Sequence, residues 1–258
     1  MNILSQSPLV WGTFLLIACR VVTIIMIVPI FGGRSVPATV KIALSLLLSL
    51  ILLPLIAARV TALPEAMPAF LTLVARELLV GALVGFAVLL VFTALQAAGH
   101  VVGLQMGFSL ANVVNPLTAD HASLIDQFYA LLAALVFFTL NGHHALIVAI
   151  EHSFDIAPVG LANLGLPPGP VLLAWGRDLF TIASRISLPV VAALLLADIA
   201  LAVIARSVPQ LNVFIVGMPA KVGIAFLMLI VTVPVTAVIM SRALVNIGEA
   251  TAQILRMG

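Results

Sequence analysis

The chain has 258 residues, of which 64% are hydrophobic and only 8% are charged, and its mean hydropathy is +1.33. A soluble domain of this length could not bury so much apolar surface in one core, so an integral membrane protein is predicted. The net charge is +2 and no basic cluster is present, which leaves nucleic-acid binding without support. The single cysteine, Cys19, can form no disulfide within the chain, and a buried small side chain is expected there.

Charge-poor runs predict about six hydrophobic helices, each near the ~20 residues that cross a bilayer. The first run lacks a basic region before it, so we expect it to remain as a helix and not to be removed as a signal peptide. In chain order the runs are 9–31, interrupted only by Arg20, and then 42–58, 78–98, 127–147, 186–205 and 222–241.

Proline and glycine mark the turns between these helices, and the segment LPPGP at Leu166–Pro170 is the strongest boundary because proline cannot continue a helix. It divides a four-helix part, residues 1–166, from a final helical hairpin, residues 167–258. The two arms of the hairpin, expected at 171–205 and 221–255, are longer than a bilayer is thick at ~1.5 Å per residue. We therefore expect helices that project beyond the lipid or tilt strongly.

Five ionisable residues lie within or beside these apolar helices. A charge buried in a membrane is costly unless it is paired, so each should face protein or water. Asp198 could belong to a proton relay, but a lone carboxylate makes a poor relay. A structural ion pair, within the chain or with a neighbouring subunit, is the favoured interpretation. The five residues are Arg20, Arg76, Glu77, Arg185 and Asp198.

Histidines gather in the middle of the chain, where a metal site would need ligands on one helix face. His144 and His152 are spaced close to two helical turns apart, with Glu151 adjacent, but the spacing matches no named hydrolase signature. Interfacial polar residues are the favoured interpretation, since Asn141 and Gly142 mark a helix end. No catalytic triad or phosphate-binding loop appears, so neither an enzyme nor a cofactor is predicted.

The stretch GLQMGFSLANVVNP, residues 103–116, closes a run from 78 to 119 that contains no Lys, Arg, Asp or Glu. Lipid penalises backbone that leaves the helical ladder, and an aqueous loop would carry charges. Two interpretations remain open: a kinked amphipathic helix inside a bundle, or a pliable neutral segment that fills a channel. The upstream segment GALVGF has two glycines four residues apart, which predicts close helix packing.

Four segments in order along the chain carry a family resemblance: VPIFGGRSVPATVKIALS (28–45), GLQMGFSLANVVNP (103–116), NGHHAL (141–146) and PQLNVFIVGMPAKV (209–222). They resemble the family of flagellar biosynthetic proteins called FliR, and together they extend over nearly the whole chain. Where the family commonly has Asp before the proline that ends the second segment, this chain has Asn115, so no charge is carried over to that position.

The resemblance implies a subunit of the export gate of the flagellar type III secretion apparatus, in the bacterial inner membrane at the flagellar basal body. One copy would join several copies of FliP and FliQ, act with FlhA and FlhB, and pass unfolded flagellar substrate proteins without catalysing a reaction. Its fold would be all-α, with residues 1–166 similar to FliP and residues 167–258 similar to the FliQ hairpin.

The resemblance also implies two functional segments. The pore plug would comprise Gln105, Met106, Gly107, Phe108, Ser109, Leu110, Asn112, Val113 and Asn115. The hairpin tip at the cytoplasmic entrance would comprise Pro209, Gln210, Asn212, Phe214 and Pro219.

Three rival functions remain open from the sequence. An injectisome homologue would have the same architecture and export virulence effectors. A secondary transporter of small molecules is favoured by the broken helices and by the repeat of RSVP at 34–37 and 206–209. An intramembrane metalloenzyme would use His143, His144 and His152.

Overall fold

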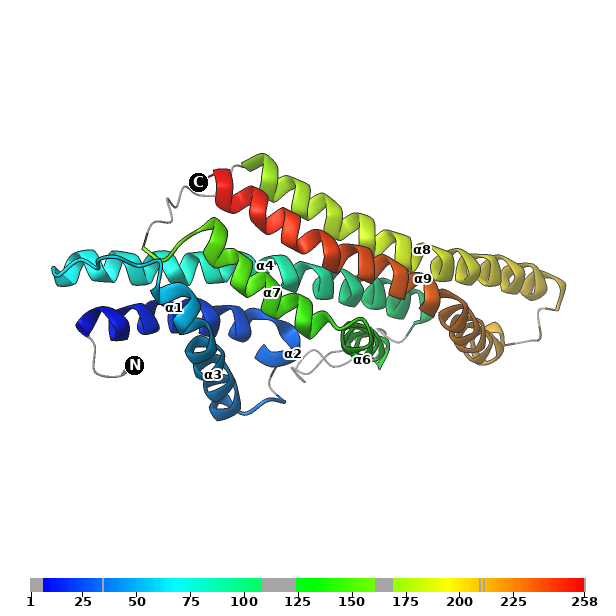
Figure 1. Cartoon of the computed structure of the whole chain (residues 1–258). Coiled ribbons are helices and arrows are strands. Elements are labelled where there is room, and N and C mark those ends of the chain that lie inside the picture. The colour runs from blue at the N-terminus through cyan, green and yellow to red at the C-terminus, as the bar shows by residue number, and fades with distance from the viewer. Residues whose placement is uncertain are drawn as a thin grey trace. The chain divides into compact units, whose positions relative to one another are not determined.

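The computed structural model describes residues 7–33, 35–107, 124–160, 169–208, 210 and 212–257, and all the regular structure in these ranges is helical (Figure 1). Five of its helices are long and apolar enough to cross a membrane, and a bent pair brings the number to six if it counts as one span. The prediction of an all-α membrane protein with about six hydrophobic helices is therefore confirmed.

The first three helices form a compact group. α1 (Ser7–Ile27) packs against α3 (Ala38–Ala57), and the four-residue helix α2 (Pro29–Gly32) lies between them in the chain. α2 begins on a proline, whose fixed φ suits the first turn of a helix. Lys41 Nζ donates to the Gly32 carbonyl oxygen at 2.8 Å, which ties the start of α3 to the end of α2. The predicted turn between the first two apolar runs is present.

α4 (Met67–Met106) is 40 residues long, much longer than the predicted 78–98. It takes in Arg76 and Glu77, which the sequence placed at the edge of the run, and it continues through Gly103. The backbone stays helical there because neighbouring helices bury residues such as Val102 completely. The first part of the neutral stretch is thus helix, and Gly107, with φ of 88°, follows the last helical residue.

The fourth apolar run is broken into two helices, α6 (Leu124–Thr139) and α7 (Gly142–Ile156), with a bend of 73° between them. The break falls on Asn141, which adopts the left-handed conformation with φ of 54°. Asparagine tolerates this conformation better than most residues, and the glycine after it relaxes the backbone further. The helix end that the sequence predicted at this dipeptide is confirmed.

The last two helices are α8 (Gly169–Ser207) and α9 (Val213–Met257). α9 begins before the predicted start at residue 221, because the Asn212 carbonyl accepts the N–H groups of Ile215 and Val216 and so opens the helix. Two residues of the expected hairpin tip, Phe214 and Pro219, are therefore helical.

The chain divides into two compact units, each of which is built from separated segments. The first unit comprises residues 1–90, 141–175 and 244–258, and the second comprises residues 91–140 and 176–243. In the first unit the fully buried side chains include Leu16, Ile24 and Val80. In the second they include Leu95, Val102 and Leu194. The sequence-based division between residues 166 and 167 stays a prediction, since residues 161–168 lie outside the described ranges.

Candidate functional site

The described part of the predicted plug is the C-terminal end of α4. Met106 is 1% exposed, and Gln105 is half-buried beside it. The Gly107 N–H donates to the Leu104 carbonyl oxygen at 3.1 Å, which closes the final turn. The other predicted plug residues lie outside the described ranges: Phe108, Ser109, Leu110, Asn112, Val113 and Asn115.

Three polar residues from three helices meet at this end of α4. Lys221 Nζ of α9 lies 2.6 Å from Asp198 Oδ1 of α8, and it also donates to the Gln105 carbonyl oxygen at 3.2 Å. Gln105 Nε2 donates to Asp198 Oδ2 at 3.1 Å. Each residue therefore contacts both of the others, and we call the group Gln105, Asp198 and Lys221 the α4 clamp. The sequence identified Asp198 as a charge that needs a partner but did not identify Lys221 as that partner.

Within the second unit, α4 also packs against α6, at residues that lie before the C-terminal end of α4. An added Cβ on Gly99 would lie 2.9 Å from the ring of Tyr129, so only glycine allows this approach. His100 Nδ1 lies 3.6 Å from Asp126 Oδ2, and Phe92 packs on Phe137 with ring centroids 5.7 Å apart. These contacts fix the last turns of α4 within the unit that contains the clamp.

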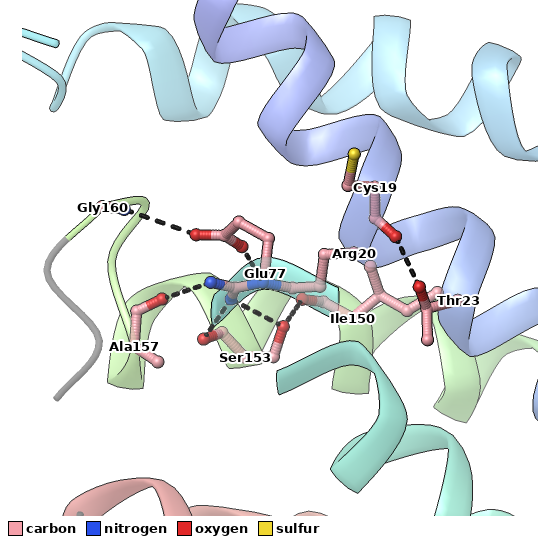
Figure 2. A network of polar contacts seen from close by, with 8 residues as sticks. All are labelled: Cys19, Arg20, Thr23, Glu77, Ile150, Ser153, Ala157 and Gly160. Atoms are coloured by element: carbon pink, nitrogen blue, oxygen red, sulfur yellow. Dashed lines mark hydrogen bonds and ion pairs between the residues drawn. The ribbon is translucent and has the colours of Figure 1, made fainter. Parts of the chain in front are cut away.

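A buried polar cluster lies in the first unit and centres on Arg20 (Figure 2). Arg20 Nε pairs with Glu77 Oε2 at 2.6 Å, and both side chains are completely buried. The remaining nitrogens of the guanidinium donate to the Ser153 carbonyl oxygen and to the Ala157 carbonyl oxygen, each at 2.8 Å. The second carboxylate oxygen of Glu77 accepts the Gly160 N–H at 3.3 Å.

This cluster joins three separated parts of the chain, as Figure 2 shows: α1 supplies Arg20, α4 supplies Glu77, and α7 with the turn after it supplies the carbonyls and Gly160. The Ser153 carbonyl lies in the last turn of α7, where it also accepts the Ala157 N–H, and the Ala157 carbonyl lies just beyond the helix end. The guanidinium also lies 4.0 Å above the centroid of the Phe154 ring. A cluster in which every charge is paired is structural in character, because it leaves no group free to exchange a proton.

The glycines of GALVGF lie directly against α1 in the same unit. An added Cβ on Gly81 would lie 2.7 Å from the Arg20 carbonyl oxygen, and one on Gly85 would lie 2.9 Å from Ile27 Cβ. The predicted close helix packing is confirmed, and it explains how α1 comes near enough to α4 for Arg20 to reach Glu77.

The two other predicted intramembrane charges lie elsewhere. Arg76 is half-buried in α4, and Arg185 is exposed on α8. Neither side chain has a carboxylate within ion-pair distance in the described ranges of the chain. Of the five charges singled out from the sequence, the structure thus pairs Arg20 with Glu77 and gives Asp198 a lysine.

The predicted entrance residues are described only in part. Gln210 and Asn212 are exposed, and Pro219 is exposed on α9. Phe214 lies in the first turn of α9, while Pro209 lies outside the described ranges.

The histidines do not form a metal site in the part of the chain that the structure describes, where no three His, Cys, Asp or Glu side chains converge. The rings of His143 and His144 lie side by side at the start of α7, with centroids 4.4 Å apart. His152 Nδ1 lies 3.5 Å from Asp155 Oδ2, and the same carboxylate pairs with Arg59. His152 is therefore part of an exposed ionic group and not of a ligand set with the other two.

Comparisons with known proteins extend over nearly the whole chain. The family described as bacterial export proteins, family 1, matches residues 11–247. The flagellar biosynthetic protein FliR of Bacillus subtilis (strain 168) is 37% identical over 246 residues, which cover 94% of this chain and 93% of the relative. FliR of Escherichia coli (strain K12) is 30% identical over 222 residues, or 84% of this chain and 83% of the relative.

A relative with another name matches to a similar extent. The Yop proteins translocation protein T of Yersinia pestis is 29% identical over 233 residues, which cover 88% of this chain and 87% of the relative. With a family match from residue 11 to residue 247 and FliR relatives at 37% and 30% identity, the chain belongs to family 1 of the bacterial export proteins, alongside the flagellar biosynthetic proteins FliR.

Proposed function

We propose that the chain is a non-enzymatic subunit of the gate of a flagellar type III export apparatus and that the segment from Gln105 to Asn115 plugs the pore of this gate. The observation that carries the proposal is the similarity to FliR at 37% identity over 94% of the chain. Family membership makes the chain a component of a bacterial protein export apparatus. The proposal adds to this the place of the chain in the gate and the role of its neutral segment as a plug.

The length of the exposed apolar surface supports a multi-subunit gate. α8 is 39 residues long and exposes large hydrophobic side chains from Leu172 to Ile204, about 48 Å at ~1.5 Å per residue, which exceeds a hydrocarbon core of ~30 Å. Exposed Arg177, Asp178 and Arg185 lie within this length, and charged side chains are costly in lipid. Protein is therefore the better cover for part of α8, and we propose that neighbouring subunits provide it.

We propose FliP and FliQ as these neighbours, in several copies each around one copy of this chain, with FlhA and FlhB as further components. The assembly would lie at the flagellar basal body in the inner membrane. Family membership supports a role in the export apparatus, and the sequence resemblance to the FliR family supports these particular partners.

The proposed plug mechanism follows from the chemistry of the neutral stretch. Because residues 78–119 contain no Lys, Arg, Asp or Glu, a plug drawn from their C-terminal part has no fixed charge with which to hold a passing chain. An unfolded substrate presents side chains of every kind, so a neutral surface avoids trapping any of them. At rest the apolar contacts exclude water, and opening costs only what those contacts contribute.

The test removes residues 107–115 from the chain in cells that assemble the whole gate and measures ion leakage across the membrane. Gln105 and Met106 stay in place, so the end of α4 is retained. We expect leakage to rise well above that of the parent, with the gate still assembled. Leakage at the parent level from an assembled gate would contradict the plug assignment.

The second candidate is the equivalent subunit of a virulence injectisome, which the similarity to the Yersinia translocation protein favours. Complementation separates the two candidates. We expect the chain to restore motility to a bacterium that lacks its own FliR. Restoration of effector secretion in an injectisome mutant, without restoration of motility, would favour the second candidate.

A further inference from the structure

The C-terminal end of α4 carries carbonyl groups that the helix itself cannot satisfy, because the last four carbonyls of a helix lack intrahelical donors. Gln105 is the last residue but one of α4, so its carbonyl belongs to this set. Its donor is the ammonium group of Lys221, at 3.2 Å. A lysine from α9 therefore caps a helix from which it is 116 residues distant in sequence.

The sign of the charge at this cap is favourable. The C-terminal end of a helix carries a partial negative charge, which attracts cations and repels anions over about one turn. Asp198 also lies here, 2.6 Å from Lys221, and on its own its carboxylate would be repelled by the same helix end. The lysine offsets this repulsion, while the Gln105 side chain donates to the carboxylate at 3.1 Å.

The α4 clamp thus does more than neutralise the half-buried charge of Asp198. Neutralisation alone would need only one acidic and one basic residue, and it would not matter which of them stood at position 198 and which at position 221. The two contacts with Gln105 require the cation at position 221 to face the carbonyl and the carboxylate at position 198 to face the amide. Exchanging the two charged residues therefore separates this oriented role from simple charge neutralisation.

We propose that Asp198 and Lys221 are positioning residues that hold the point at which the chain leaves α4, and so set the starting position of the pore plug. The inference rests on the proposed function. Two of the three clamp contacts fall on Gln105, two residues before Gly107 turns the backbone out of the helix with φ of 88°. α8 and α9 thereby hold the base of the plug.

The test uses the assembled gate and compares three changes: Lys221→Met, Lys221→Arg, and the reciprocal exchange that combines Asp198→Lys with Lys221→Asp. Assembly is measured by co-purification of the gate subunits, and closure is measured as ion leakage. Lys221→Met removes the cap and the ion pair. Lys221→Arg keeps a cation that can donate to both partners. The exchange re-forms the ion pair but places a carboxylate, which cannot donate, against the Gln105 carbonyl.

We expect Lys221→Arg to assemble and to leak no more than the parent. The exchange should restore assembly relative to Lys221→Met but leak several-fold more than the parent. A role limited to stabilising the fold predicts the opposite, namely that the exchange closes as tightly as the parent, and this result would overturn the proposal. If Lys221→Met fails to assemble, Gln105→Leu replaces it, since it removes the contact with Asp198 and leaves the ion pair and the Lys221 contact with the backbone carbonyl in place. We expect that variant to leak above the parent, and parent-like closure would overturn the role proposed for Asp198.

The deletion of residues 107–115 is measured in the same cells. If the deletion leaks and the clamp variants do not, the clamp proposal fails while the plug assignment stands. If the deletion does not leak, the plug assignment fails and the clamp proposal fails with it.

Discussion

Arg20 of α1 and Glu77 of α4 form an ion pair with 2.6 Å between Nε and Oε2, and both side chains are completely buried. Removing one partner of a buried pair leaves the other charge without compensation, which typically costs about 3–5 kcal/mol. We therefore expect Glu77→Gln, which preserves the shape of the side chain, to lower the free energy of unfolding by about that amount. Denaturant unfolding of the detergent-purified protein measures the loss.

The matched control for this change is Arg59→Gln, because Arg59 also pairs with a carboxylate, that of Asp155, but does so with side chains 56% and 39% exposed. Solvent screening limits an exposed pair to at most about 1 kcal/mol. Equal losses from Glu77→Gln and Arg59→Gln would show that burial of the Arg20 pair contributes nothing.

Gly81→Ala is expected to destabilise the packing of α1 on α4. The added Cβ would lie 2.7 Å from the Arg20 carbonyl oxygen, which is backbone and cannot rotate away. Overpacking of this kind costs about 1–3 kcal/mol. The midpoint of thermal unfolding reports the change.

Gly176→Ala is the comparison, since a Cβ at this helical position would meet no atom within 4 Å. Alanine in a helix interior is favoured over glycine by about 0.5–1 kcal/mol, so this variant should be as stable as the parent or more stable. Equal unfolding midpoints for Gly81→Ala and Gly176→Ala would contradict the close approach of α1 to Gly81.

Asn141, between α6 and α7, has φ of 54° and ψ of 34°. Glycine adopts this conformation without a steric cost, whereas a β-branched residue is strained by about 1–2 kcal/mol. We expect Asn141→Gly to keep the parent's unfolding midpoint and Asn141→Val to lower it. A valine variant as stable as the glycine variant would contradict the left-handed conformation.

Elemental analysis distinguishes the proposed export function from a metalloenzyme. We expect the purified chain to carry no stoichiometric zinc, because His152 faces Asp155 at 3.5 Å and that carboxylate already pairs with Arg59. The double change His143→Ala with His144→Ala serves as the control. If the parent chain carried one zinc ion and the double change removed it, the result would support the metal-site hypothesis.

The number of helices and several of their breaks could be predicted from the sequence because they depend on local chemistry. Hydropathy identified the apolar runs, the Asn141–Gly142 dipeptide marked the break before α7, and the spacing of Gly81 and Gly85 predicted the tight contact with α1. The lengths of the helices could be predicted less well from the sequence. α4 extends well beyond its most apolar section: packing buries Val102 and Met106 at its C-terminal end, whereas Met67 and Leu71 at its N-terminal end are exposed.

Partners of the charged residues could not be predicted, since they come from distant parts of the chain. The acceptors of Arg20 on Ser153 and Ala157 are 133 and 137 residues away, and they are backbone carbonyls that no motif identifies. Lys221 stands at the expected start of the second hairpin arm, and nothing in the sequence assigned it to Asp198.

Gentle detergent extraction followed by purification of the tagged chain tests the export-gate proposal most directly. We expect FliP and FliQ to co-purify with it in one complex, and we expect the chain alone to transport nothing. Recovery of the chain without either protein, together with uptake of a small molecule by vesicles that contain only this chain, would contradict the account.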